Sequence, residues 1–134
     1  MVGAGASQLE DRLSNILKPR DMYIVPDPNP QAGYYYRSDH ISLAKKGVPM
    51  LYADSGLNHR INGLEYGEEF SKTYERERYH KPADEYDNSW DLSGITEMTE
   101  VFFELGYDIA DSDEWPNWYD GTEFRALWDK LREE

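Results

Sequence analysis

The chain has 134 residues, which suits a single domain, and its 39% hydrophobic and 14% aromatic residues supply enough apolar surface for a core. A formal net charge of −13, with lysines and arginines scattered along the chain, argues against nucleic acid or an anionic membrane as a partner. There is no cysteine, so any metal site must use His, Asp or Glu. No apolar run approaches the roughly 20 residues of a membrane span, which predicts a soluble chain.

The first predicted elements are a helix and a short strand. Ser7 and Glu10 have the spacing of a capping box, and apolar residues then recur on one helical face, which predicts a helix over residues 7–18. Residues 23–25 predict a short strand. The prolines within residues 26–30 predict a surface loop, because proline continues neither a helix nor a sheet ladder.

A short helix and a second strand come next. Ser38 predicts the N-cap of a helix that turns Ile41 and Ala44 inward, and Gly47 predicts its left-handed end. Residues 50–53 predict a buried strand. A helix followed by glycine, proline and a short apolar strand is typical of the second half of an α/β crossover unit, so the predicted fold class is α/β with a mainly parallel sheet.

The second half of the chain predicts a long connection and two helices. Residues 54–91 are polar and lack a sustained period, which predicts a functional loop with one helical turn near residues 66–73. A helix then starts at Asp91 or Ser93, and a last one is opened by Thr122. Their expected apolar faces are Ile95, Met98, Phe102, Leu105 and Ile109 for the first, and Phe124, Leu127, Trp128 and Leu131 for the last.

His80 is the strongest candidate for a metal ligand. It lies between Tyr79 and a segment that holds Pro82, Asp84 and Glu85, so carboxylates are within reach of its ring. A zinc-bound imidazole presents one nitrogen to the metal while an acceptor holds the other, and Asp84 or Glu85 are candidates for that second-shell role.

The other two histidines carry weaker signals. His40 follows Asp39 at the start of the predicted short helix, where helix capping already explains the carboxylate. His59 lies in the long loop, and nothing in its surroundings suggests a role. A run of four acidic residues predicts a solvated helix end, because it lacks the spacing and the glycine of a calcium-binding loop. These residues are Asp108, Asp111, Asp113 and Glu114.

Several enzyme classes are excluded by their missing signatures. The chain has no His-Glu-x-x-His pair, no Gly-x-Ser-x-Gly turn, no phosphate-binding Walker loop and no cysteine nucleophile.

Two stretches together resemble the co-catalytic di-zinc aminopeptidases, a family that also includes glutamate carboxypeptidase-like enzymes, glutaminyl cyclases and transferrin receptors. Residues 34–52 read YYYRSDHISLAKKGVPMLY, and residues 79–87 read YHKPADEYD, followed by WDLSG at residues 90–94. The order and separation of the two stretches match the family, and the likeness runs over nearly the whole chain. The resemblance implies the C-terminal portion of a mixed, mostly parallel sheet flanked by helices, within one catalytic domain over residues 1–134.

The resemblance also implies roles for individual residues. His80 matches the last zinc ligand of the family along the chain, and Tyr79 matches a tyrosine that donates a hydrogen bond to the tetrahedral intermediate. Asp39 and His40 match a stretch that lines the substrate side of the pocket. The implied activity is hydrolysis of N-terminal residues from peptides, with two zinc ions in the complete enzyme.

The ligand count predicts an incomplete site. The family's other ligands and its general-base glutamate come from sequence that precedes this region, so the chain supplies at most one zinc ligand and is expected to be inactive alone. Only two strands are predicted, which leaves sheet edges open. The expected partners are a peptide substrate and the missing N-terminal half of the catalytic domain, in cis or in trans. An excised piece, a truncated gene product and one half of a split enzyme all fit this pattern.

Two other functions stay open. Relatives without catalytic activity show that the fold also serves as a non-catalytic binding or structural module. A glutaminyl cyclase-like acyltransferase is the second alternative, but those relatives have Trp at the position of Tyr79. The compartment is undetermined, although family members are often exported, which would make the parent enzyme secreted or periplasmic.

Overall fold

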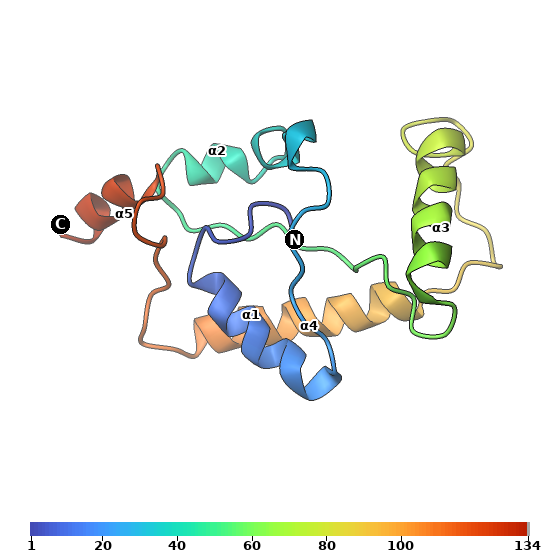
Figure 1. Cartoon of the computed structure of the whole chain (residues 1–134). Helices are drawn as coiled ribbons and strands as arrows, with labels where there is room; N and C mark the ends of the chain where they lie inside the picture. Colours follow the sequence, from blue (N-terminus) through green and yellow to red (C-terminus); the bar gives the residue numbers. More distant parts are fainter. Residues whose placement is uncertain (134) are drawn as a thin grey trace. The chain divides into compact units, whose positions relative to one another are not determined.

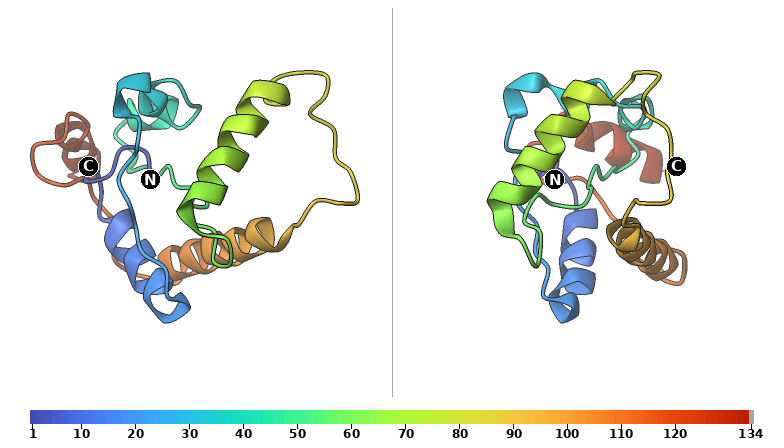
Figure 2. Two further views of the ribbon diagram at one scale, coloured as in Figure 1. Left: turned by 45° about the vertical axis from the view of Figure 1, so that its right-hand side comes forward. Right: turned by 90° about the vertical axis from the view of Figure 1, so that its right-hand side faces the viewer.

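The structure is a computed structural model that describes residues 1–133 (Figures 1 and 2). The chain forms two compact units, the first made of Met1–Asp54 together with the residues from Met98 onward, and the second of Ser55–Glu97. The α-helices of the described part are α1 (Leu9–Leu17), α2 (Ile41–Ala44), α3 (Gly63–Glu77), α4 (Ser93–Ala110) and α5 (Arg125–Arg132). Single 3₁₀ turns occupy Lys18–Arg20, Pro30–Ala32 and Tyr34–Tyr36.

The predicted sheet is wrong, because no strand is present within residues 1–133. The segment expected as the second strand makes one isolated antiparallel bridge, in which the Val2 backbone N–H donates to the Tyr52 carbonyl at 3.0 Å. Tyr23 and Val25, expected in the first strand, are 74% and 44% exposed. A strand is stable only when a neighbouring strand pairs its backbone groups, and runs of three or four apolar residues do not show whether such a neighbour exists.

The first unit contains a core between α1 and α4, which lie close together in the ribbon views (Figures 1 and 2). Leu13 and Val101, 1% and 0% exposed, lie at its centre. The predicted helix over residues 7–18 is confirmed by α1, and the predicted start of the next helix at Asp91 or Ser93 is confirmed by α4. The remaining buried members of this core are Ile16, Leu17 and Leu105.

The capping box at the start of α1 is only half formed. The Glu10 carboxylate accepts hydrogen bonds from the backbone N–H groups of Gly5, Ala6 and Ser7 at 2.8, 2.7 and 3.3 Å. The Ser7 hydroxyl instead donates to the Met50 carbonyl at 3.3 Å, so this buried side chain ties the start of α1 to residue 50.

A second core surrounds Trp118, which is fully buried, as is Ala44, and which lies beside the buried Ile41. The Trp118 indole N–H donates to the Gly47 carbonyl at 2.6 Å, and Gly47 has a φ of +90°. The inward placement of Ile41 and Ala44 and the left-handed end at Gly47 are therefore confirmed. The predicted Ser38 N-cap is wrong, since α2 begins without a side-chain cap.

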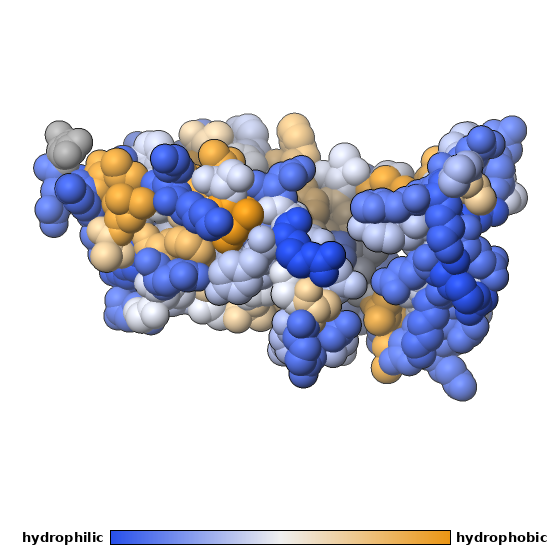
Figure 3. Space-filling view, turned by 90° about the horizontal axis from the view of Figure 1, so that it is seen from above, coloured by the Kyte–Doolittle hydropathy of each residue, from blue (hydrophilic) through white to orange (hydrophobic). Residues whose placement is uncertain are grey.

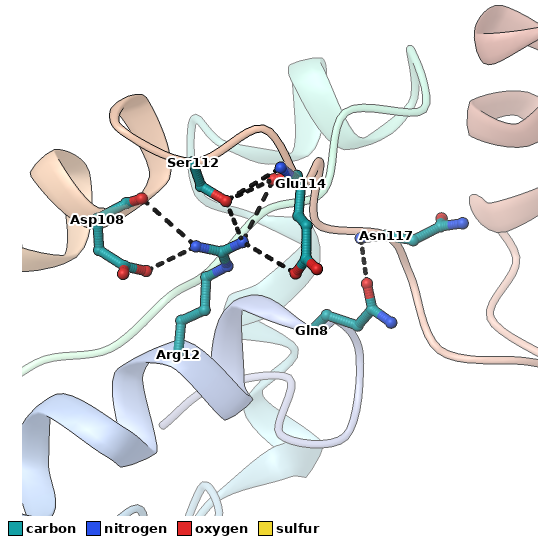
Figure 4. Close-up of polar contacts among 6 residues, drawn as sticks. All are labelled: Gln8, Arg12, Asp108, Ser112, Glu114 and Asn117. Carbon is teal, nitrogen blue, oxygen red and sulfur yellow. Dashed lines mark hydrogen bonds and ion pairs between the residues drawn. The ribbon is translucent and has the colours of Figure 1, made fainter.

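A polar network joins α1 to the end of α4 (Figure 4). The Arg12 guanidinium donates to the Asp108 carboxylate at 2.7 Å, to the Ser112 hydroxyl at 3.1 Å and to the Glu114 carbonyl at 3.3 Å. Asp108 is thus an ion-pair partner rather than a purely solvated member of the acidic run. Two shallow clefts, of 340 and 450 Å³, lie beside this network, and no predicted site residue lines either one.

The second unit is built around α3, which is 15 residues long. The prediction of a loop with a single turn at residues 66–73 was therefore wrong. The His59 ring supports the start of α3, because its Nδ1 accepts hydrogen bonds from the backbone N–H groups of Ile61 and Asn62 at 3.2 and 3.0 Å. Gly67 allows a close approach, since a Cβ there would lie 1.7 Å from the Leu57 carbonyl oxygen.

The last predicted helix is confirmed by α5, three residues after Thr122. No helix among residues 1–133 is both long enough and apolar enough to cross a membrane.

Candidate functional site

Tyr79 and His80 lie where α3 ends. The Tyr74 carbonyl accepts hydrogen bonds from the backbone N–H groups of both Arg78 and Tyr79, at 2.8 and 3.0 Å, which closes the helix. His80 then has a φ of +57°, a left-handed conformation that is uncommon for residues other than glycine. This turn of the backbone stops the helix and places the two side chains at its C-terminal end.

The two rings form one stacked pair. Their centroids are 4.0 Å apart with an angle of 24° between the ring planes, and both residues are exposed, Tyr79 by 50%. The Tyr74 ring is also near Tyr79, at a centroid distance of 6.1 Å. An exposed phenol beside an exposed imidazole offers a hydrogen-bond donor and a nitrogen ligand at one place.

The carboxylates predicted to orient His80 lie on the same loop but have other contacts. Asp84 accepts a hydrogen bond from the Tyr74 hydroxyl at 2.8 Å, and this bond is the main reason why the pKa of Tyr74 is raised. Glu85 is exposed. Among residues 1–133, neither carboxylate hydrogen bonds to His80. Near the end of α3 the Tyr79 ring thus contacts both His80 and Tyr74, and Tyr74 in turn bonds to Asp84.

Asp87 organises the loop after His80, a role that the sequence reasoning missed. Its carboxylate accepts hydrogen bonds from the Ser89 hydroxyl, from the Ser89 backbone N–H at 2.8 Å and from the Trp90 indole at 3.1 Å. The bond from the Ser89 hydroxyl is the largest cause that lowers the pKa of Asp87, followed by the Ser89 backbone bond. The spacing Asp-x-Ser is the sequence signal that predicts such a turn.

Asp39 and His40 lie in the first unit, at the start of α2. Asp39 is exposed, whereas the His40 ring packs against Tyr35 and Tyr52 at centroid distances of 4.7 and 5.4 Å. The His40 Nε2 and the Tyr35 hydroxyl are both buried and lack a hydrogen-bond partner within the described residues. Burial raises the pKa of Tyr35 to about 12 and lowers that of His40.

The lowered pKa of His40 predicts that the first unit loses stability in mild acid. Its folded-state pKa lies below the ordinary value of 6.5, so the stabilisation is present above pH 6.5 and is lost as the pH falls through the folded value. Tyr35, which packs against the ring, stays neutral over this range because its pKa is raised to about 12. Chemical unfolding followed by tryptophan fluorescence from pH 8 to about pH 5 checks this.

The control for this prediction is His40→Phe, which keeps an aromatic ring and removes the titrating group. The variant should show a flatter dependence of unfolding free energy on pH below 6.5. An unchanged slope in this variant would show that another group is responsible.

The comparison with known families identifies the chain. The profile described as "Peptidase family M28" matches residues 1–106, which is most of the sequence. The chain belongs to this family. No curated protein and no solved structure matched the chain. The M28 match confirms the resemblance to zinc-dependent peptidases that the two sequence stretches indicated.

M28 peptidases are zinc-dependent hydrolases, so the described residues can be tested as a zinc site. A catalytic zinc needs about three protein ligands. No group of three or more His, Asp or Glu side chains within residues 1–133 is close enough together to hold a metal ion. The described residues therefore do not form a zinc site by themselves.

Proposed function

We propose that this chain is part of a zinc-dependent M28 aminopeptidase that removes N-terminal residues from peptides, and that the chain alone is inactive. The exposed, stacked Tyr79 and His80 at the end of α3 carry this proposal, because they place a phenol and an imidazole side by side in a zinc-peptidase family. The expected inactivity follows from the ligand count, since most of the metal ligands and the general-base glutamate must come from other polypeptide.

His80 is the proposed zinc ligand of this chain. Its ring is exposed, and its left-handed backbone holds it at the helix end rather than within a core. Asp84 and Glu85 follow on the same loop, and we assign them to the second shell, where a carboxylate fixes the imidazole through its other nitrogen. In this proposal Asp84 exchanges its contact with Tyr74 for one with His80 when the site is complete.

Tyr79 is the proposed catalytic residue. When the carbonyl of a peptide bond is attacked, its oxygen gains negative charge, and a positioned phenol stabilises that charge by donating a hydrogen bond. The Tyr79 hydroxyl belongs to a ring that is stacked on the proposed ligand, so donor and metal site share one location. This arrangement favours hydrolysis over a role in metal binding alone.

Asp39 and His40 are proposed to contact the substrate. The buried His40 Nε2 lacks a partner within the described residues, and leaving such a group unsatisfied costs about 1–3 kcal/mol, which a bound polar group would offset. An exposed Asp39 carboxylate suits the ammonium at the N-terminus of a peptide, as does the net charge of −13.

A non-catalytic module of the same family is the second candidate. The observation that favours it is the absence of any three-ligand group among residues 1–133. The two candidates differ in whether the Tyr79 and His80 pair acts on a substrate once the other ligands are supplied.

The test is to measure zinc content and aminopeptidase activity of the chain alone and of the chain joined to an N-terminal half of an M28 catalytic domain. Zinc should bind in about stoichiometric amount, with release of an aminoacyl reporter, only in the joined protein. Stoichiometric zinc on the chain alone would contradict the ligand count. A zinc-loaded joined protein that cleaves no aminoacyl or dipeptide substrate would favour the non-catalytic module.

A further inference from the structure

His59 binds three consecutive backbone groups at the start of α3. Its ring Nδ1 accepts hydrogen bonds from the backbone N–H groups of Ile61 and Asn62 at 3.2 and 3.0 Å. Its own carbonyl accepts one from the Gly63 N–H at 2.8 Å. The first N–H groups of a helix have no partner within the helix, so acceptors from outside stabilise its start. For α3 these acceptors belong to His59.

The residue at the usual capping position does not share this role. Asn62 occupies the N-cap position of α3, yet its side chain makes no capping hydrogen bond. Asparagine is among the best N-cap residues because its side-chain oxygen accepts such bonds. The half-buried His59 ring therefore replaces an oxygen cap, and unlike that cap it can gain a proton near neutral pH.

The two ring bonds require a neutral His59. A ring nitrogen that accepts a hydrogen bond carries no proton, so the proton of this ring lies on Nε2. In a protonated imidazole both nitrogens are donors, and Nδ1 would then face two N–H groups that have lost their acceptor. The positive charge would also lie at the positive end of the helix dipole. Both effects oppose the observed start of α3 once the ring is protonated.

The charged and titratable groups around the ring include one carboxylate that attracts its protonated form. The pKa of Asp91 is lowered chiefly by hydrogen bonds from the backbone and side chain of Ser93, and a protonated His59 adds a smaller electrostatic effect. The other such groups are Tyr66, at a ring centroid distance of 5.0 Å, and the neighbouring Arg60, which pairs with Glu97 at 2.7 Å. Asp91 is therefore the anion that a protonated ring can pair with.

Within its own unit α3 has little besides its ends to stabilise it. None of its 15 residues is buried, and the part of the surface that carries α3 is mostly hydrophilic in the view of Figure 3. A helix of this length is marginal in water without tertiary packing. The cap that His59 provides is therefore a large part of what stabilises the first turn.

We propose that His59 is a pH-dependent cap of α3, which stabilises the first turn while its ring is neutral and releases that turn in mild acid, when the protonated ring pairs with Asp91. The stabilisation is present above the range in which histidine side chains titrate, around pH 6.5, and is lost as the pH falls through that range. This inference does not depend on the proposed function, although α3 ends at Tyr79 and His80.

The test is NMR of the isotope-labelled full chain between pH 8 and about pH 5. Ring nitrogen shifts report the protonation state of His59, and Cα shifts of residues 63–66 report the ratio of helical to open first turn. At pH 8 the ring should carry its proton on Nε2. As the ring gains a second proton, the ratio should fall by about 2- to 30-fold, the effect of losing one N-cap.

Four variants separate this effect from other titrations. His59→Asn supplies a cap that takes up no proton over this range, so its first turn should become insensitive to pH. Asp91→Asn can still accept the hydrogen bond from the Ser93 N–H, but it removes the anion and should move the transition to lower pH. His40→Phe and His80→Asn are controls for the other two histidines of the chain and should leave the transition unchanged.

Three results would each overturn the proposed cap. They are a His59 ring with its proton on Nδ1 at pH 8, a first turn whose helical fraction does not change as the ring titrates, and an equal pH dependence in His59→Asn. A transition that Asp91→Asn does not move would overturn the pairing of the protonated ring with Asp91.

Discussion

Tyr79→Phe in the chain completed with the missing ligands should lower turnover by about 10- to 1000-fold and leave zinc content unchanged. The substitution removes one hydroxyl from a ring that is half exposed and stacked on His80, so the packing of the pair is kept. A donor aimed at the charge of the transition state contributes only during the reaction, so turnover should fall more than the Michaelis constant changes. Steady-state kinetics with an aminoacyl reporter, together with metal analysis, measures both quantities.

The matched control is Tyr86→Phe. Tyr86 is also an exposed tyrosine of the second unit, but its ring contacts Trp90 and not His80. Its loss should leave turnover close to that of the unchanged protein. Full activity of the Tyr79 variant, or loss of zinc from it, would show that the hydroxyl does not act on the reacting carbonyl.

The helices of the first unit could be predicted because the apolar residues of their buried faces recur in the sequence at helical spacing. Leu13 and Leu17 are four residues apart and both are buried, and Leu105 lies on the predicted face of α4. The face of α4 was misjudged by one position, since Val101 is buried while Phe102 is 39% exposed. Both residues are apolar, so periodicity alone could not choose between them.

The helix α3 was missed because it lacks such a buried apolar face. Its apolar residues do not pack against a core, and two glycines within its span, Gly63 and Gly67, weaken the helical signal. Its start depends on the His59 ring as a hydrogen-bond acceptor, a cap that falls outside the usual set of Ser, Thr, Asp and Asn. The predicted strands failed because pairing is a property of distant segments.

The proximity of Tyr79 and His80 follows from their adjacency in the chain, but their stacking does not. The left-handed φ of His80 turns the backbone between the two rings, and although histidine adopts this conformation more often than most residues, its occurrence at a given position is too uncommon to predict from sequence. The contact between Asp84 and Tyr74 could not be predicted from the sequence either, because it depends on where α3 ends. The sequence therefore named the candidate residues, and the structure added the stacking of the Tyr79 and His80 rings and the contact of Asp84 with Tyr74.

His80→Asn should reduce the zinc affinity of the completed protein by more than about 100-fold, which exceeds the usual effect of losing a second-shell partner. Asparagine is the suitable replacement because it tolerates the left-handed backbone that His80 adopts, so the end of α3 should be preserved. Activity should fall in parallel with bound zinc. Titration of the metal-free protein with zinc, followed by a competing chelator, measures the affinity.

His59→Asn is the control for the loss of a histidine from the same unit. Asparagine is a good helix cap, so it can replace the Nδ1 contacts with Ile61 and Asn62, and zinc affinity should not change. Circular dichroism of both variants should match that of the unchanged chain, because neither substitution removes a buried side chain. Unaltered zinc affinity in the His80 variant would show that the metal site does not lie at the end of α3. The proposed role of Tyr79 as a hydrogen-bond donor would then be contradicted as well, because it requires the metal site to be there.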